Sequence, residues 1–157
     1  MIDKIYAIRI LYLLKRGYEH WTLFDKGLIT QEGEVIKNSP EITPIHRLAM
    51  LIKKFTDKIP LFSIYIAKKI FFECKLTDSE KNILLEASRI NISTTTLNES
   101  KSATDLEHEI KNSNVKSKKD LKILIDKFEM LSKSNSVTDS EMERITDLLI
   151  KLGHKYE

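Results

Sequence analysis

The fold class of this chain is set by its opening stretch, Ile2-Asp-Lys-Ile-Tyr-Ala-Ile-Arg-Ile-Leu-Tyr-Leu-Leu-Lys-Arg-Gly17. Its apolar side chains recur at the spacing of a helix, at Ile2, Ile5, Tyr6, Ile8, Leu11, Tyr12 and Leu14. Lys15 and Arg16 carry charges that suit a helix C-terminus, and Gly17 is a typical helix stop. The stretch therefore predicts a long helix that ends before Gly17.

The composition extends this prediction to the rest of the chain. Its 157 residues include 4 Gly and 3 Pro, while the helix formers Lys, Glu, Leu and Ile dominate. With 41% hydrophobic residues, the chain can bury one well-packed core or two small ones. We expect a mainly α protein, a helical bundle.

Charge and cysteine content exclude several classes of protein. The net charge of +3 does not create the broad positive field that duplex-binding domains usually carry. Cys74 is the single cysteine, which excludes an intramolecular disulfide and a multi-cysteine metal site. We expect it to be a small buried side chain. No stretch reaches the roughly 18 apolar residues of a membrane span, and no signal peptide is predicted, so a soluble protein without membrane contact is expected.

The segment from Trp21 to Ile36 is irregular and lies between strongly periodic stretches. A short helical turn is expected between Thr22 and Lys26, ended by Gly27. Leu28-Ile29-Thr30 and Glu34-Val35-Ile36 then flank a Gln-Glu-Gly turn. This pattern predicts a small β-hairpin near residues 28–36, or a pair of extended segments.

Later helices are predicted from their first turns and their apolar stripes. Thr43-Pro44 is an N-cap and first-turn pair for a second long helix. In residues 61–75 the apolar side chains cover almost the whole circumference, so this helix is expected to be central to the core or half covered by a partner. Thr77-Asp-Ser-Glu80 and Thr138-Asp-Ser-Glu141 have the spacing of a capping box. The helix after the second box is expected to stop at Gly153.

A change of composition suggests two parts. Residues 91–103 are polar and hydroxyl-rich, which is typical of a linker. We expect a helical core domain with a hairpin insertion over 1–90 and a C-terminal helical hairpin over 104–157. Because the second part holds two of the 12 aromatic residues, it is expected to pack on the first part or on something else.

No cluster of catalytic or metal-binding side chains is evident. His20 and His46 have polar neighbours, but no further ligands or acid–base partners accompany them. We interpret His46 as a partly exposed polar residue near a helix start. Asp25-Lys26-Gly27 lacks the second glycine and the Lys-Ser/Thr pair of a phosphate-binding loop. We therefore predict a protein that is not an enzyme, with no cofactor and no metal.

Two groups of side chains are candidates for contact with other molecules. A basic stripe along the second and third helices could neutralise phosphates or meet an acidic protein, although a solvated helix face also explains it; it consists of Arg47, Lys53, Lys54, Lys58, Lys68 and Lys69. The candidate partner-binding aromatics are Trp21, Phe24, Tyr65 and Phe72. The spacing of Tyr18, Trp21 and Phe24 also suits residues that plug the end of a helical core.

Residues 13–60 resemble a segment of small uncharacterised proteins of large tailed, T4-like bacteriophages. The order is an apolar helix, an aromatic link, a Gly-Leu/Ile-Ile hairpin with a second Gly, and a lysine-rich helix opened by Thr-Pro. It is carried by Trp21, Phe24, Gly27, Leu28, Ile29, Gly33, Thr43, Pro44, His46, Arg47, Leu48, Lys53 and Lys54. Those relatives more often carry Asp where this chain has Thr30. The resemblance implies a setting, a virion or the host cytoplasm of an infected cell, and no catalytic residues.

The expectation from the sequence is a non-enzymatic bacteriophage protein. Its expected role is that of a virion structural or assembly component that contacts other phage structural proteins or itself. The alternative is a nucleic-acid-binding accessory or host-takeover factor that uses the lysine stripe. Gene neighbourhood would distinguish these roles, because structural and early genes are usually grouped separately.

Overall fold

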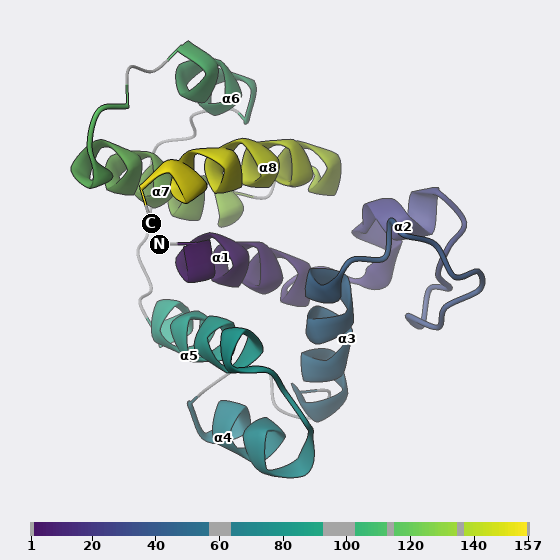
Figure 1. Cartoon of the computed structure of the whole chain (residues 1–157). Helices are drawn as coiled ribbons and strands as arrows, with labels where there is room; N and C mark the ends of the chain where they lie inside the picture. The colour runs from purple at the N-terminus through teal and green to yellow at the C-terminus, as the bar shows by residue number, and fades with distance from the viewer. Residues whose placement is uncertain (1, 57–63, 93–102, 113–114, 135–136, 157) are drawn as a thin grey trace.

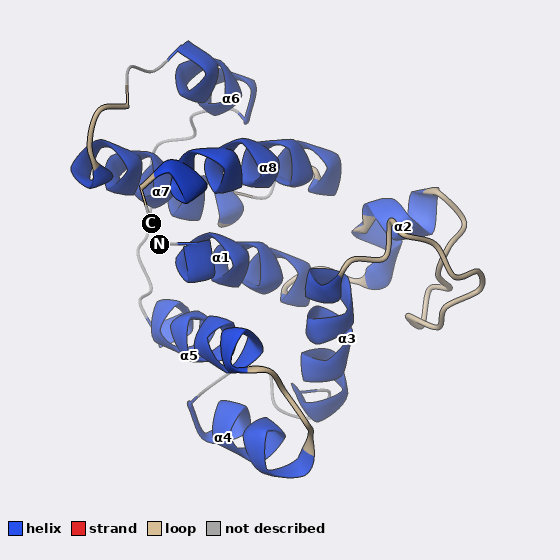
Figure 2. Ribbon diagram, viewed as in Figure 1, coloured by secondary structure: helices blue, strands red, loops and turns tan. Residues whose placement is uncertain are grey.

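The computed structural model describes residues 2–56, 64–92, 103–112, 115–134 and 137–156. The protein is mainly α, as expected from the sequence (Figure 2). Within the described ranges the chain forms eight α-helices and one 3-10 turn, Tyr18–His20, and no residue belongs to an extended strand. No helix in these ranges has both the length and the apolar character to cross a membrane.

Helix α1 (Ile2–Leu14) is the centre of the structure. It packs against α3 (Pro44–Thr56) and α5 (Asp78–Ile92) on one side and against α7 (Lys118–Ser132) and α8 (Asp139–Lys155) on the other (Figure 1). Every residue of α1 from Ala7 to Leu13 is buried. A helix with apolar side chains around most of its circumference can satisfy that surface only when neighbours cover it on several sides.

Helix α8 approaches the start of α1 through a glycine. A Cβ atom built on Gly153 would lie 2.9 Å from Cγ1 of Ile2, so the missing side chain permits this close packing. The expected stop at Gly153 is therefore wrong, because α8 continues to Lys155 and the glycine lies inside the helix. Its role is close approach of two helices, which the sequence alone does not separate from a helix stop.

The predicted β-hairpin near residues 28–36 is also wrong. A single isolated bridge joins Ile29 and Val35, and the segment is otherwise a turn. Thr30 N–H donates to the Glu34 carbonyl at 2.8 Å, and Gly33 has a φ of +85° that favours glycine. Leu28 and Ile29 are buried while Val35 and Ile36 are exposed. Pairing is limited to this one bridge, and a two-stranded ladder without further strands is only marginally stable.

Helix α4 (Ile64–Glu73) lies at the edge of the molecule (Figure 1). It packs mainly on α5 and α3 and buries Ala67 and Ile70. Phe72 is 94% exposed. The expectation that this helix is central to the core is therefore wrong. One side of α4 packs on the protein, and the side that carries Phe72 is exposed. The side chains of residues 64–66, Tyr65 among them, lie outside the described set.

The helix starts follow the predicted cap chemistry. At α5, Glu80 N–H donates to Thr77 Oγ1 at 3.1 Å and Thr77 N–H donates to Glu80 Oε1 at 2.9 Å. Thr138 and Glu141 form the same capping box at α8. Ser117 caps α7 by accepting a hydrogen bond from Asp120 N–H. Both predicted capping boxes are confirmed.

One hydrophobic core joins the residues on both sides of the proposed linker. It includes side chains of α1, α3 and α5 and also those of α6 (Ala103–Asn112), α7 and α8. Helix α5 runs to Ile92 and α6 starts at Ala103, so most of the polar stretch, residues 93–102, lies outside the described residues. The C-terminal helices pack on α1, which was one of the two expected outcomes for this part.

Candidate functional site

A buried ionic cluster lies where α1, α3 and α8 meet. The Arg9 guanidinium pairs through Nη1 with Oδ1 of Asp139, and its Nη2 lies 3.4 Å from Oε1 of Glu143. The other oxygen of Asp139 accepts a hydrogen bond of 2.8 Å from the backbone N–H of Thr22, at the start of α2 (Thr22–Asp25). Arg9 therefore joins α1 to α8, and Asp139 joins α8 to α2.

Burial determines what this cluster does for the fold. Arg9 and Asp139 are each 3% exposed, so both ions have lost most of their hydration. The attraction between them offsets that loss only when the geometry is good and further hydrogen bonds are made. Any packing of α1 on α8 that separates the two ions leaves an uncompensated buried charge. The pair thus disfavours alternative registers of these helices.

His46 forms a variant of the capping box at the start of α3. The Thr43 backbone N–H donates to His46 Nδ1 at 3.1 Å, and the His46 backbone N–H approaches Thr43 Oγ1 at 3.4 Å. Glu or Gln usually accepts the first of these bonds. A backbone N–H can only donate, so Nδ1 is an acceptor and the neutral ring carries its proton on Nε2.

The Nε2 atom of His46 is buried without a hydrogen-bond partner in the described part of the chain. It lies 3.6 Å from Oε1 of Glu143, which is longer than a hydrogen bond. The imidazole is also 6.1 Å from the ring of Trp21, centroid to centroid. The prediction of a partly exposed His46 is wrong, because α3 packs on α1 and places the ring beside Trp21 and Glu143, so that the residue is 4% exposed.

The same side chains could be considered as metal ligands. The ligand atoms of His46, Asp139 and Glu143 all lie within 4.8 Å of one another. A metal would need Nε2 without its proton, yet the bond from Thr43 N–H to Nδ1 favours a proton there. Arg9 already pairs with both carboxylates and would repel a divalent cation. The geometry therefore suits an ionic clasp between helices better than a metal centre.

A cleft of about 730 Å³ opens beside the cluster. Its apolar walls come from several elements and include Tyr6, Leu23, Ile45, Leu48 and Ile83. Burial, with a smaller contribution from the carboxylate of Asp147, raises the pKa of the Tyr6 phenol. Arg9, His46 and Glu143 line the cleft as well, so the ionic cluster forms part of its wall, although Nε2 of His46 is itself closed off from solvent.

The structure separates the predicted partner-binding aromatics. Trp21 has no exposed surface, and its Nε1–H donates to the Leu13 carbonyl at 3.2 Å. Its ring packs 4.7 Å from that of Tyr18, centroid to centroid, so it plugs the end of the core. Phe24 and Phe72 are exposed, in α2 and α4 respectively. These two side chains are available for contact, and Trp21 supports the fold.

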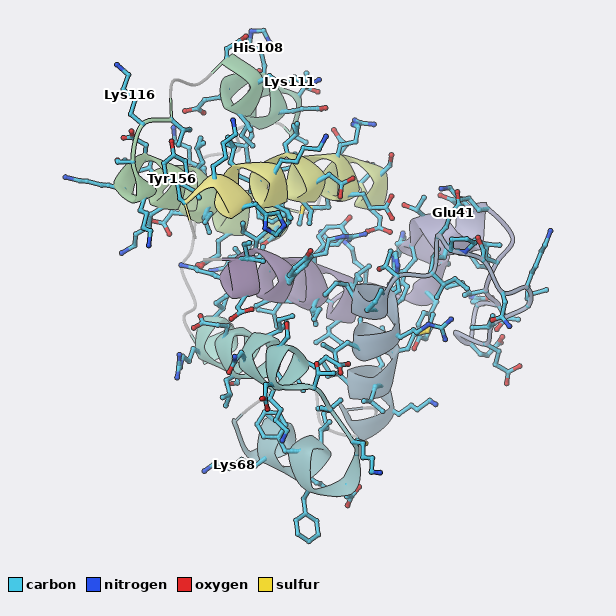
Figure 3. The ribbon with its side chains drawn as sticks, in the orientation of Figure 1. Glu41, Lys68, His108, Lys111, Lys116 and Tyr156 are labelled. Atoms are coloured by element: carbon cyan, nitrogen blue, oxygen red, sulfur yellow. The ribbon has the colours of Figure 1, made fainter. Side chains whose placement is uncertain are left out.

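The residues of the predicted lysine stripe do not form one continuous exposed surface within the described part of the chain. Arg47 and Lys54 are exposed and stand two turns apart on α3, so they share a face. Nζ of Lys53 lies instead 4.8 Å from the centroid of the Tyr18 ring. Lys68 and Lys69 are exposed on α4, and Lys68 points away from the body of the protein (Figure 3). Lys58 lies outside the described residues.

Sequence reasoning missed the ionic cluster. Arg9 interrupts an otherwise apolar helix, and that interruption is a signal for a buried partner carboxylate. Thr43 and His46 have the same spacing as the two recognised capping boxes, which could have placed the histidine in a cap. Nothing in the sequence pairs Arg9 with Asp139, because 130 positions separate them.

Comparison with known proteins gives no match to this chain among family models, curated proteins or solved structures.

Proposed function

We propose that this protein is a non-enzymatic bacteriophage protein, a structural or assembly component of the particle that acts through contacts with other proteins. One observation carries the proposal. Helix α2 and the loop that follows it project from the helical body (Figure 1), and this segment exposes the apolar side chains of Phe24, Val35 and Ile36. Exposed apolar side chains gathered on one projecting segment are typical of a protein contact site.

The backbone that carries these side chains is held by the protein itself. Leu28 N–H donates to the Leu23 carbonyl at 3.0 Å, and Ile36 N–H donates to the Leu28 carbonyl at 2.8 Å. Leu28 and Ile29 anchor the loop in the core. A contact segment that is already ordered loses less conformational entropy on binding, which favours its use for recognition. The resemblance of residues 13–60 to phage proteins supplies the proposed setting.

The test compares incorporation of variants into phage particles. Phe24→Ser combined with Ile36→Ser removes two of the three exposed apolar side chains of this segment, and the matched control changes Ile123 and Met130, which are exposed on α7, to Ser. We expect mass spectrometry of purified particles to detect the unchanged protein and the α7 control and to lose the loop variant. Circular dichroism checks that each variant is folded.

Two outcomes would overturn this proposal. One is absence of the unchanged protein from particles together with a monomeric state in solution. The other is equal incorporation of the loop variant and its control. Trp21→Ala is unsuitable for this test because the side chain is buried and its loss is expected to damage folding.

A second candidate function is nucleic-acid binding. The observation that favours it is the exposure of Arg47, Lys54, Lys68 and Lys69 on two helices that pack together. Such cations bind phosphates with an affinity that falls steeply as salt rises. Lys54→Glu and Lys69→Glu are expected to weaken binding of DNA or RNA. Absence of binding at low salt would exclude this candidate.

A further inference from the structure

The outer side of α4 combines one aromatic side chain with several lysines. Lys68 and Lys69 precede Phe72 by four and three residues, and positions with these spacings are neighbours on a helix surface. Lys75 and Lys81 lie beyond the end of α4. Together with Phe72 they line a shallow hollow of about 600 Å³. We call this set, Lys68, Lys69, Phe72, Lys75 and Lys81, the α4 face.

The α4 face has charges that the fold does not use. Within the described residues, none of its four lysines forms an ion pair. Lys68, Lys69 and Lys75 are exposed, and Lys81 is half-buried. Of the nearby carboxylates, Glu80 accepts the capping bond of Thr77, and Glu73 and Asp78 remain exposed. The four lysines therefore outnumber the three carboxylates in this region.

Phe72 likewise has no role in the core. At 94% exposure it buries almost none of its apolar surface, while its neighbours Ile70 and Ala67 are fully buried. A ring in this position contributes little to folding. Its faces are open to a planar partner, and the surrounding lysines could hold negatively charged groups on either side of it.

We propose that the α4 face binds single-stranded nucleic acid, with a base stacked on the ring of Phe72 and neighbouring phosphates held by the lysines. This inference rests on the nucleic-acid candidate above and names its substrate class. Single-strand binding proteins combine basic surfaces with aromatic rings on which unpaired bases stack. Duplex bases are already stacked on one another, so a duplex would meet the lysines without using the ring.

Other partners fit the α4 face less well. Lysine is depleted in protein–protein interfaces, whereas here lysines surround the aromatic side chain. A helix that binds a membrane surface needs a broad apolar face to insert, but the apolar side of α4 with Ala67 and Ile70 is already packed in the core. A single ring among lysines suits stacking better than insertion.

The experiment measures fluorescence anisotropy of labelled oligothymidylate and oligouridylate of about 12 nucleotides, a length within the range of single-strand sites. A duplex of equal length and vesicles rich in phosphatidylserine are the comparison ligands. The protein variants are Phe72→Leu, Phe72→Tyr and Lys68→Gln combined with Lys69→Gln. Lys119→Gln combined with Lys122→Gln, two exposed lysines on α7, is the matched charge control.

We expect Phe72→Leu to weaken single-strand binding by between about 5-fold and 150-fold, the range found when a stacking aromatic is lost. Phe72→Tyr keeps a stacking ring and should bind nearly as well as the unchanged protein. Each lysine removed from the α4 face should reduce the salt dependence, by about 0.7 in the slope of log affinity against log salt. The α7 control should change neither quantity.

Three results would overturn the inference, and each has a distinct meaning. If the protein binds single strands and duplex with equal affinity, and Phe72→Leu does not change either affinity, the single-strand assignment is contradicted. The nucleic-acid candidate function would still be supported. No binding to either nucleic acid at low salt would remove both. Vesicle binding that is weakened by Lys68→Gln combined with Lys69→Gln, without oligonucleotide binding, would assign the α4 face to a membrane surface.

Discussion

Helices α1 and α4 have similar apolar content and opposite surroundings. In α1 the apolar side chains are spread around the helix, whereas in α4 Lys68 and Lys69 interrupt them on one side. Helix α1 is covered by four other helices, so that even Arg9 is buried, whereas α4 packs mainly on two and leaves Phe72 exposed. The charged residues of the two helices also differ in burial. Arg9 of α1 pairs with Asp139 inside the protein, whereas Lys68 and Lys69 of α4 are exposed to solvent.

This difference shows that the apolar content of a helix does not by itself determine where the helix lies. The number of neighbours that can pack around a helix determines how much of that surface is covered. In α1 the covered charge constrains packing, because a buried ion requires its partner. In α4 the uncovered ring and lysines have no such constraint and are available to bind another molecule. Four predictions test this contrast.

The largest effect is expected from removing the buried cation of α1. Arg9→Met leaves Asp139 charged and buried without its partner, and should lower the free energy of unfolding by about 3–5 kcal/mol. Lys69→Met, the matched change on α4, should alter it by less than about 0.5 kcal/mol. Urea unfolding measures both. Adding Asp139→Asn to Arg9→Met should recover part of the loss, and equal effects of the two single variants would contradict the contrast.

The second-largest effect is expected on the buried side of α4, where a substitution should cost more stability than one on the exposed side. Ile70→Ala empties a fully buried position and should cost about 2–5 kcal/mol. Phe72→Ala, two residues further along, should change the free energy of unfolding by less than about 0.5 kcal/mol, since the ring is exposed. The same urea experiment applies. A large loss of stability in Phe72→Ala would mean that the ring packs on the protein in solution.

Changes at His46 test how the cluster beside α1 tolerates charge. His46→Gln keeps an acceptor for the Thr43 N–H, as in an ordinary capping box. His46→Glu keeps it too but places a second negative charge near Glu143, and should be less stable than His46→Gln by on the order of 2 kcal/mol at neutral pH.

The pH dependence of that difference gives a second measurement. Repulsion from Glu143 should raise the folded-state pKa of the introduced carboxyl above its unfolded value. The group then favours folding in acid, and this contribution is lost as the pH rises through the folded pKa. The stability gap between the two variants should therefore narrow in acid. A gap that stays constant with pH would indicate a steric cause.

The smallest effect is expected at Tyr12, which lies three residues after Arg9 on α1. Its phenol donates to the Val137 carbonyl at 2.8 Å, and the Arg16 guanidinium lies 3.8 Å from the ring centroid. Tyr12→Phe loses that hydrogen bond and should cost about 1 kcal/mol. Urea unfolding at neutral pH measures the loss.

Burial is the largest influence on the Tyr12 pKa and raises it above 10.0, with the nearby Arg16 acting in the opposite direction. A raised pKa means that the neutral phenol stabilises the fold below the unfolded pKa, and that this stability is lost as the pH rises through the folded pKa. The difference between Tyr12→Phe and the unchanged protein should therefore shrink at alkaline pH. A difference that grows there would contradict the assignment.

Local features of the fold are predictable, and long-range ones are not. The caps at Thr77 and Thr138 depend on residues three positions apart, so their spacing is visible in the sequence. The turn after Ile29 is visible too, but the predicted hairpin is wrong, because two short segments gain too little from pairing with each other alone to extend beyond one bridge. The pairing within the ionic cluster has no local signature, since Arg9, His46 and Asp139 come from three helices and Arg9 and Asp139 are 130 positions apart.

Side-chain patterns along the chain are enough to establish the mainly α class, the capped helix starts and the residues that can bear charge or stack. These properties arise from side chains a few positions apart, where helix geometry sets their relations. Tertiary packing was needed to establish that α1 is central and α4 peripheral, that Trp21 is buried while Phe72 is exposed, and that Arg9 meets Asp139. Burial and pairing depend on segments brought together by the whole core, and no local pattern specifies them.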